Sequence, residues 1–151
     1  MIVYTVRSLK HVEPLTASGY PGRWNKPDQF VIYAAESRSL ASLEWLVNRG
    51  GRILSLDFVL LALKLKIEVN HVKLLNDNLL MKNWRSLGAY SSLQELGSQW
   101  YKEETYKVLS VPSALVPEER NLVIHQGLGT RNDFIEVLDV QPVEWLSRLQ
   151  W

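Results

Sequence analysis

The stretch GRWNKPDQFVIYAAESRSLASLE, from Gly22 to Glu44, decides how this 151-residue chain folds, because it passes from a loop through a strand into a helix. Its first residues belong to a long segment, residues 8–29, that is rich in Gly, Pro and polar residues and therefore predicts a loop. The apolar run Phe30–Ala35 (FVIYAA) predicts a short buried strand. We expect the functional centre in this stretch, since long ordered loops of small domains often carry function.

The last part of the stretch predicts an amphipathic helix. Ser37 or Ser39 can cap its start, and Gly50-Gly51 ends it. Its apolar stripe is predicted to consist of Leu40, Leu43, Leu46 and Val47. Glu44 lies at the edge of this stripe and points partly inward, where a carboxylate is either paired or functional.

The rest of the chain predicts more strands than helices. Strands are expected in Ile2–Arg7, within Arg52–Val69, and in Tyr106–Val111, Leu122–Ile124 and Phe134–Val140. Helices are expected after a capping box at Ser92–Glu95 and in Val143–Leu149. No repeat, linker or low-complexity tract divides residues 1–151, so we expect a single α+β domain.

The composition excludes several classes of site. With no cysteine, the chain has no disulfide framework, zinc–cysteine site or cysteine nucleophile. Its three histidines are scattered, so we expect no metal site. A net charge of +1 predicts no direct binding of nucleic acid, and no apolar run is long enough to span a membrane. The N-terminus lacks the pattern of a signal peptide, and we expect a cytoplasmic protein.

Arg23, Trp24 and Tyr33 are the first candidate functional residues. An arginine after Gly22 can clamp a phosphate or carboxylate through two hydrogen bonds, although most loop arginines are simply solvated. Trp24 beside it would help to fix the guanidinium. Tyr33 either packs in the core with a satisfied hydroxyl or contacts a planar ligand.

Glu44 is the most informative single residue. The alternative to a functional role is a salt bridge at the rim, for instance with Arg23 or Arg49. Ser37 and Ser113 also have ordinary explanations, as a helix cap and as the start of a turn. Taken together, these side chains are compatible with binding a dinucleotide and cleaving an N-glycosidic bond through an oxocarbenium-like sugar, which a carboxylate stabilises.

Six motifs occur in a specific order: GRWN (Gly22–Asn25), IYAAES (Ile32–Ser37), LASLE (Leu40–Glu44), LMKNW (Leu80–Trp84), LGSQW (Leu96–Trp100) and VLSVPSALVPEERN (Val108–Asn121). In this order and spacing the chain resembles the RES-domain family, the toxin half of bacterial RES–Xre toxin–antitoxin pairs. The resemblance covers nearly the whole chain, and we expect residues 1–151 to be one RES domain. The segment after Ser113 departs from the family, because it lacks the usual Asn-Pro.

The resemblance implies an ADP-ribosyltransferase-like fold, a mixed sheet core with flanking helices around a split NAD-binding cleft. It implies NAD as a substrate, with no further cofactor. Arg23 would clamp the pyrophosphate, Tyr33 would contact nicotinamide or ribose, and Glu44 would stabilise the oxocarbenium ion. The substrate-binding set would also include Trp24, Ser37 and Ser113.

The implied function is a bacterial toxin that consumes NAD by hydrolysis or phosphorolysis of its nicotinamide–ribose bond. An Xre-like helical antitoxin would neutralise it, in a complex that contains a toxin homodimer. Two alternatives stay open. The protein can be an ADP-ribosyltransferase that acts on a host protein, or a non-catalytic interaction module that binds through the GRWN loop and exposed tryptophans.

Overall fold

The strands of the chain join into one mixed sheet. The structure, a computed structural model, describes residues 1–52, 57–127 and 133–149. Within them the strand order is β4-β5-β6-β2-β1-β3-β7, and all neighbours are antiparallel except β4 and β5. The strands are β1 (Ile2–Ser8), β2 (Val31–Ala35), β3 (Phe58–Leu65), β4 (Val72–Leu74), β5 (Val108–Pro112), β6 (Arg120–His125) and β7 (Ile135–Pro142).

Helices flank this sheet. Among the described residues the α-helices are α1 (Arg38–Asn48) and α2 (Tyr90–Glu103). Short 3-10 helices are η1 (Leu9–His11), η2 (Val69–His71), η3 (Asp77–Leu79), η4 (Leu87–Ala89) and η5 (Glu144–Leu149). The predicted α+β domain, a mixed sheet core with flanking helices, is therefore confirmed. None of the helices in the described ranges is long and apolar enough to cross a membrane.

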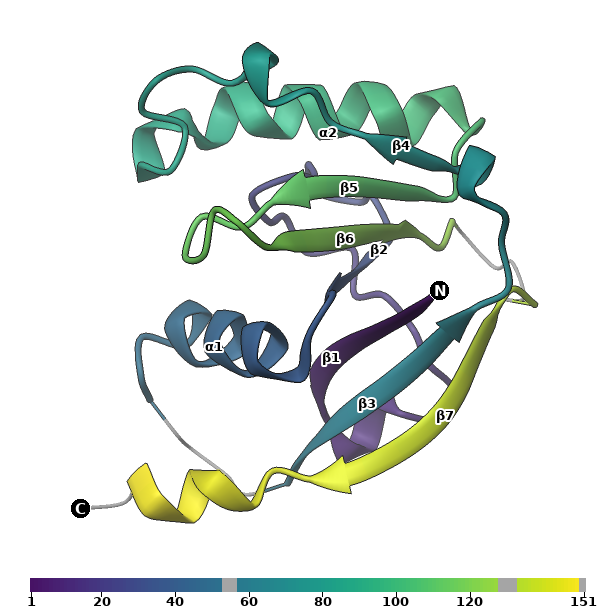
Figure 1. The fold of residues 1–151 in the computed structure, drawn as a ribbon, viewed down its shortest axis with the longest axis vertical. Helices are drawn as coiled ribbons and strands as arrows, with labels where there is room; N and C mark the ends of the chain where they lie inside the picture. The colour runs from purple at the N-terminus through teal and green to yellow at the C-terminus, as the bar shows by residue number, and fades with distance from the viewer. Residues whose placement is uncertain (53–56, 128–132, 150–151) are drawn as a thin grey trace.

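The sheet is nearly divided between β1 and β2. These two strands pair only at Tyr4 and Ala35, whereas β1 pairs with β3 and β2 pairs with β6 along their lengths. Figure 1 shows β1, β3 and β7 on one side of this division and β4, β5 and β6 on the other, with β2 passing between them. Helix α1 follows β2 and packs against both β1 and β2, beside the point where the strands diverge.

Helix α1 confirms the predicted cap and corrects the predicted buried face. The Ser37 hydroxyl accepts the Leu40 amide at 3.1 Å, and Gly50 after the helix has φ 61°. Leu43 and Val47, which were expected inside, are 40% and 48% exposed. The helix instead packs through Leu40, Ala41 and Trp45, because the sheet meets it on that side. The Trp45 ring lies tilted against that of Phe58, with ring centroids 4.7 Å apart.

The start of α2 was also predicted wrongly. The helix begins at Tyr90, directly after η4, and its N-cap Ala89 makes no side-chain cap, so Ser92 and Glu95 lie inside it. Glu95 forms an ion pair with Lys26 rather than a capping box. The strand predicted within Arg52–Val69 is confirmed at Phe58–Leu65, while 53–56 lie outside the described residues. Strand β4 was not predicted, because three residues are too short for a clear alternation.

Asn25, in the GRWN motif, holds the loop before β2 in shape. It is 1% exposed, and its Nδ2 donates to the carbonyls of Tyr20, Lys26 and Gln29 at 2.9–3.2 Å. Its Oδ1 accepts the Tyr33 hydroxyl proton at 2.7 Å, and that hydroxyl accepts the Trp24 amide at 3.0 Å. These hydrogen bonds tie parts of the loop to one another and to Tyr33 of β2.

Helix α2 clamps this loop from outside. Gln29 Nε2 donates to Ser98 Oγ at 2.8 Å, and Gln94 Nε2 donates to the Gly22 carbonyl at 2.8 Å. At Gly97 the helix backbone approaches Trp24 so closely that a Cβ would lie 1.7 Å from the Trp24 carbonyl oxygen. The Trp24 ring is 2% exposed and lies in the cluster that α2, β5 and β6 share. Only glycine fits at position 97.

We expect Gly97→Ala to destabilise the protein at the upper end of, or beyond, the roughly 1–3 kcal/mol typical of overpacking. The obstructing atom is a backbone oxygen, which cannot turn away as a side chain can. Chemical denaturation measures the change in the free energy of unfolding. Gly88→Ala is the matched control, because its Cβ would meet nothing nearer than 3.9 Å. Equal stability of the two variants would contradict the close approach.

We expect Tyr33→Phe to lower the free energy of unfolding by about 1–3 kcal/mol, because it leaves the Trp24 amide and the Asn25 Oδ1 without their partner. Burial raises the pKa of Tyr33 above the value of about 10 that it has when unfolded. The stability that this tyrosine contributes is therefore present below about pH 10 and is lost as the pH rises further. The difference between wild type and variant should shrink above that pH. Tyr20→Phe is the control, since Tyr20 is 79% exposed.

Candidate functional site

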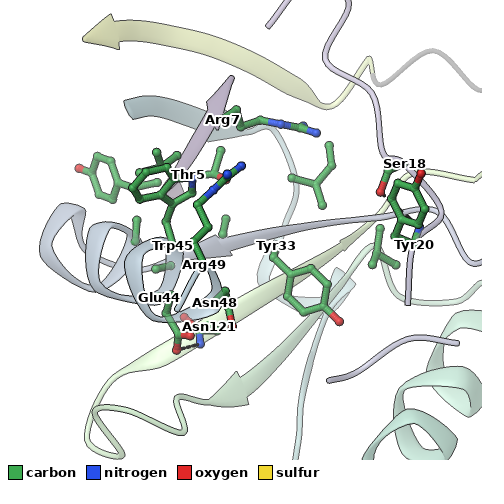
Figure 2. A pocket seen from close by; sticks show the side chains of 17 residues that line it. Thr5, Arg7, Ser18, Tyr20, Tyr33, Glu44, Trp45, Asn48, Arg49 and Asn121 are labelled. Carbon is green, nitrogen blue, oxygen red and sulfur yellow. Dashed lines mark hydrogen bonds between the residues drawn. The ribbon is translucent and has the colours of Figure 1, made fainter. Parts of the chain in front are cut away.

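A pocket of about 570 Å³ opens where β1 and β2 diverge. Its walls come from β1, β2, the inner face of α1, the loop around Ser18 and Tyr20, and Asn121 at the start of β6. Figure 2 shows Glu44 and Asn121 together at one end, Tyr33 in the middle, and Arg7 and Arg49 toward the other end. A volume of this size fits a nucleotide-sized ligand.

Glu44 occupies the pocket through the packing of α1. Because Ala41, Trp45 and Asn48 also line the pocket, Glu44 lies on the pocket-facing side of the helix rather than at the edge of an apolar stripe. Its Oε1 accepts the Ser113 hydroxyl at 2.8 Å and the Asn121 Nδ2 at 2.5 Å. The predicted alternative, a rim salt bridge with Arg23 or Arg49, is not among the ion pairs of the described residues.

Ser113 approaches Glu44 from the turn after β5. It is fully buried, and its Oγ accepts the amides of Leu115 and Val116 at 3.0 Å each. Both of its acceptor positions are thus used, so its one hydroxyl proton goes to Glu44. Ser113 does not line the pocket itself.

Ser37 lies outside the pocket as well. Besides capping α1, its hydroxyl donates to Glu119 Oε2 at 2.9 Å. Glu36 Oε1, next in the chain, accepts the Arg120 amide at 2.9 Å. These bonds tie the start of α1 to the segment between β5 and β6, and so hold Ser113 and Asn121 in place against the helix.

Tyr33 lines the middle of the pocket with its ring. Its hydroxyl is committed to Trp24 and Asn25, and burial raises its pKa, so the hydroxyl stays protonated. A Cβ at Gly22 would lie 2.6 Å from this hydroxyl, which explains a glycine there. The ring is therefore the part of Tyr33 that is available to a ligand.

Arg23 and Trp24 do not line the pocket. The Arg23 Nη1 donates to the carbonyls of Trp84 and Arg85 at 3.2 Å, and its guanidinium lies 4.7 Å from the centre of the Tyr90 ring. Trp24 is buried beneath α2, so its side chain supports the loop and does not contact a ligand in this pocket.

Two other arginines supply positive charge to the pocket. Arg7, near the end of β1, donates from Nη2 to the Thr16 carbonyl at 2.6 Å, while its Nη1 is buried without a hydrogen-bond partner. Burial lowers the pKa of Arg7, yet an arginine stays charged. Arg49 lies over the rings of Trp45 and Phe58, with its Cζ 5.0 and 4.4 Å from their centres. Both guanidinium groups thus bring positive charge to the lining of the pocket, where an anion would be attracted.

The sequence did not single out Arg7 or Asn121. Arg7 ends a predicted strand, and Asn121 is the last residue of the VLSVPSALVPEERN motif, but neither is predicted as a site residue. Their positions in the sequence are the signal that could have indicated them, because polar residues at strand ends beside a buried core commonly face a site. Among the described residues no group of three or more His, Asp or Glu side chains is arranged to hold a metal ion.

Comparison with known proteins shows to which family the chain belongs. The profile of the RES domain family matches residues 3–145. A relative named "Toxin Res" from Photorhabdus laumondii is 35% identical over 129 residues, covering 83% of this chain and 81% of the relative. Another "Toxin Res", from Yersinia enterocolitica, is 38% identical and covers 72% of this chain and 70% of the relative.

Two further matches extend the comparison. A protein of Sphingobium sp. named "Prs ADP-ribosylating toxin" is 35% identical, over 69% of this chain and 65% of its own length. The crystal structure of the M. tuberculosis MbcT–MbcA toxin–antitoxin complex contains a chain with the same fold, at a TM-score of 0.73 and 17% identity, covering 99% of this chain and 88% of that one. From the match over residues 3–145 and the identities of the relatives, the chain belongs to the RES domain family.

Proposed function

We propose that this protein is a toxin that consumes NAD by breaking the bond between nicotinamide and ribose. The observation that carries the proposal is the charge arrangement of the pocket, with the carboxylate of Glu44 at one end and the guanidinium groups of Arg7 and Arg49 toward the other. NAD needs this arrangement, since its sugar becomes cationic during cleavage and its pyrophosphate is anionic. The relatives named as toxins support the biological role.

The step proposed at Glu44 is loss of nicotinamide from C1′ of the ribose. The C1′–N1 bond breaks, both of its electrons go to the pyridinium nitrogen, and neutral nicotinamide leaves. The positive charge moves to the ribose as an oxocarbenium ion, which the Glu44 carboxylate stabilises. A nucleophile (water, phosphate or a protein side chain) then bonds to C1′ and gives up a proton.

The structure changes the residue that we propose for the pyrophosphate. Arg23 was expected to be the clamp, but its guanidinium is bonded to backbone carbonyls outside the pocket. Arg7 and Arg49 both line the pocket and carry positive charge. We therefore assign the pyrophosphate to these two arginines, and the face of the nicotinamide or ribose to the Tyr33 ring. No cofactor besides the NAD substrate is needed for this reaction.

A second candidate is transfer of ADP-ribose to a protein, which the relative named "Prs ADP-ribosylating toxin" favours. It uses the same pocket and the same first step. Radiolabelled NAD separates the two, because only transfer leaves the label on a protein. The interaction-module alternative has less support, since it required exposed tryptophans, and Trp24, Trp45, Trp84, Trp100 and Trp145 are all buried or half-buried.

The proposal includes an antitoxin. The MbcT–MbcA structure is a toxin–antitoxin complex, and the folds agree over nearly the whole of this chain. We propose a helical, Xre-like antitoxin that keeps the enzyme inactive, bound to a toxin homodimer in the cytoplasm.

We expect the purified protein to release nicotinamide from NAD, and Glu44→Gln to lower kcat at least about 100-fold, since the neutral amide cannot stabilise a cation as a carboxylate does. Chromatography of released nicotinamide measures this. Glu118→Gln is the control, because Glu118 is an exposed carboxylate that does not line the pocket. Equal rates for the wild type and the Glu44 variant would refute the role of Glu44.

We expect Arg7→Gln to raise KM for NAD about tenfold or more, because a charge-assisted bond to the pyrophosphate is lost. Arg23→Gln should change KM less, since Arg23 already bonds to Trp84 and Arg85. Nicotinamide release over a range of NAD concentrations gives both values. A larger effect at Arg23 would restore the assignment made from the sequence.

A further inference from the structure

Both hydrogen bonds to Glu44 end on the same oxygen. Ser113 Oγ and Asn121 Nδ2 each donate to Oε1, and no hydrogen bond among the described residues reaches Oε2. Ser113 lies in the turn after β5, Asn121 lies in β6, and Glu44 lies on α1. One carboxylate oxygen is thus fixed from two directions, and the other is left for the pocket.

The orientation of both donors is determined. Ser113 has only its hydroxyl proton to give, because Leu115 and Val116 use its acceptor positions. Asn121 must present its NH₂ group to Glu44, because its amide oxygen would repel a carboxylate. The consequence is visible on the other side of the amide, where Asn121 Oδ1 is buried without a hydrogen-bond partner. A buried acceptor without a partner is unfavourable. The hydrogen bond from Nδ2 to Glu44 therefore keeps the amide in an orientation that leaves its Oδ1 without a partner.

We propose that Asn121 is a positioning residue for the reaction at Glu44, and that with Ser113 it fixes Oε1 so that Oε2 alone faces the developing cation. This inference rests on the proposed function, in which Glu44 stabilises an oxocarbenium ion. Without the two donors the side chain of Glu44 turns freely on α1, and its charge is no longer fixed where C1′ becomes positive.

The register of the sheet explains why this residue reaches the helix. Asn121 pairs with Ala35, the last residue of β2, just before the chain turns through Ser37 into α1. On its other side it pairs with Val111 of β5, two residues before Ser113. The same end of the sheet therefore places both donors beside the helix that carries Glu44. Asn121 also lines the pocket, as Figure 2 shows.

The test is steady-state nicotinamide release by Asn121→Leu and Asn121→Asp, two variants close in size to asparagine. Asn121→Leu removes one donor and should lower kcat about 10- to 100-fold while KM for NAD changes less than about threefold. Asn121→Asp puts an oxygen where Nδ2 lies 2.5 Å from Glu44, so it should lower kcat further. Ser113→Ala should show the same kcat effect without a KM effect.

Asn78→Leu is the matched control for the loss of an asparagine, since Asn78 is exposed and outside the pocket. It should keep wild-type kcat and KM. An unchanged kcat in folded Asn121→Leu, shown by thermal unfolding, would overturn the proposal. So would a rise in KM at constant kcat, which would mean that Asn121 contacts the substrate instead.

A readout that needs no activity separates this inference from the proposed function. The side-chain amide protons of Asn121, observed by ¹H–¹⁵N NMR, should shift upfield in Glu44→Ala, because the bond to the carboxylate is lost. If the wild type releases no nicotinamide but this shift occurs, the proposed function fails and the positioning of Glu44 stands. If the amide signals are the same in both proteins, the positioning fails whatever the activity.

Discussion

The pairing of β1 with β2 at Tyr4 and Ala35 alone is the constraint on which the rest of the structure depends. Antiparallel neighbours form a ladder of hydrogen bonds when they pair along their length. Between β1 and β2 most of this ladder is absent. Each still pairs fully on its other side, with β3 and with β6, so the sheet holds together while its middle opens. The opening becomes a pocket, and α1 packs beside it with Glu44 on the pocket side.

The GRWN loop is hydrogen-bonded to β2, which borders the open centre of the sheet. Asn25 donates to the Gln29 carbonyl and accepts the Tyr33 hydroxyl proton. The Gln29 side chain in turn joins the loop to Ser98 on α2. The approach of α2 at Gly97 leaves no space between helix and loop. The Tyr33 ring is thus held in the pocket by contacts that lie behind it. Arg23 and Trp24 of the GRWN motif contact other parts of the chain and do not line the pocket.

The fold was easier to predict from the sequence than the site. Strands such as Phe58–Leu65 are long apolar runs, and the Ser37 cap has a direct local signal, so local physics was sufficient there. The buried face of α1 was missed, because it depends on where the sheet divides, which is a property of pairing between distant segments.

In the site, too, residues with a local signal in the sequence could be predicted, and residues placed by distant contacts could not. Glu44 and Tyr33 stood out as polar groups within apolar patterns, and both line the pocket. The place of Asn121 and Arg7 in the site depends on residues that are distant in the sequence. Asn121, for example, donates a hydrogen bond to Glu44, which is 77 positions away. The carbonyl partners of Arg23, at Trp84 and Arg85, come from another part of the chain, so the local sequence does not indicate them.

The number of carboxylates in the pocket bears on the proposed cleavage of a glycosidic bond. Glu44 is the one acidic residue among the described side chains that line it. Ordinary glycosides require two carboxyl groups, because one must protonate a leaving oxygen that would otherwise depart as an anion. Nicotinamide needs no such proton, since its ring nitrogen carries a positive charge before the bond breaks and becomes neutral as it leaves. The Tyr33 hydroxyl does not act as a second acid, since it is bonded on both sides and its pKa is raised. A pocket with one fixed carboxylate thus suits a substrate whose leaving group is already activated, and this supports NAD as the proposed substrate.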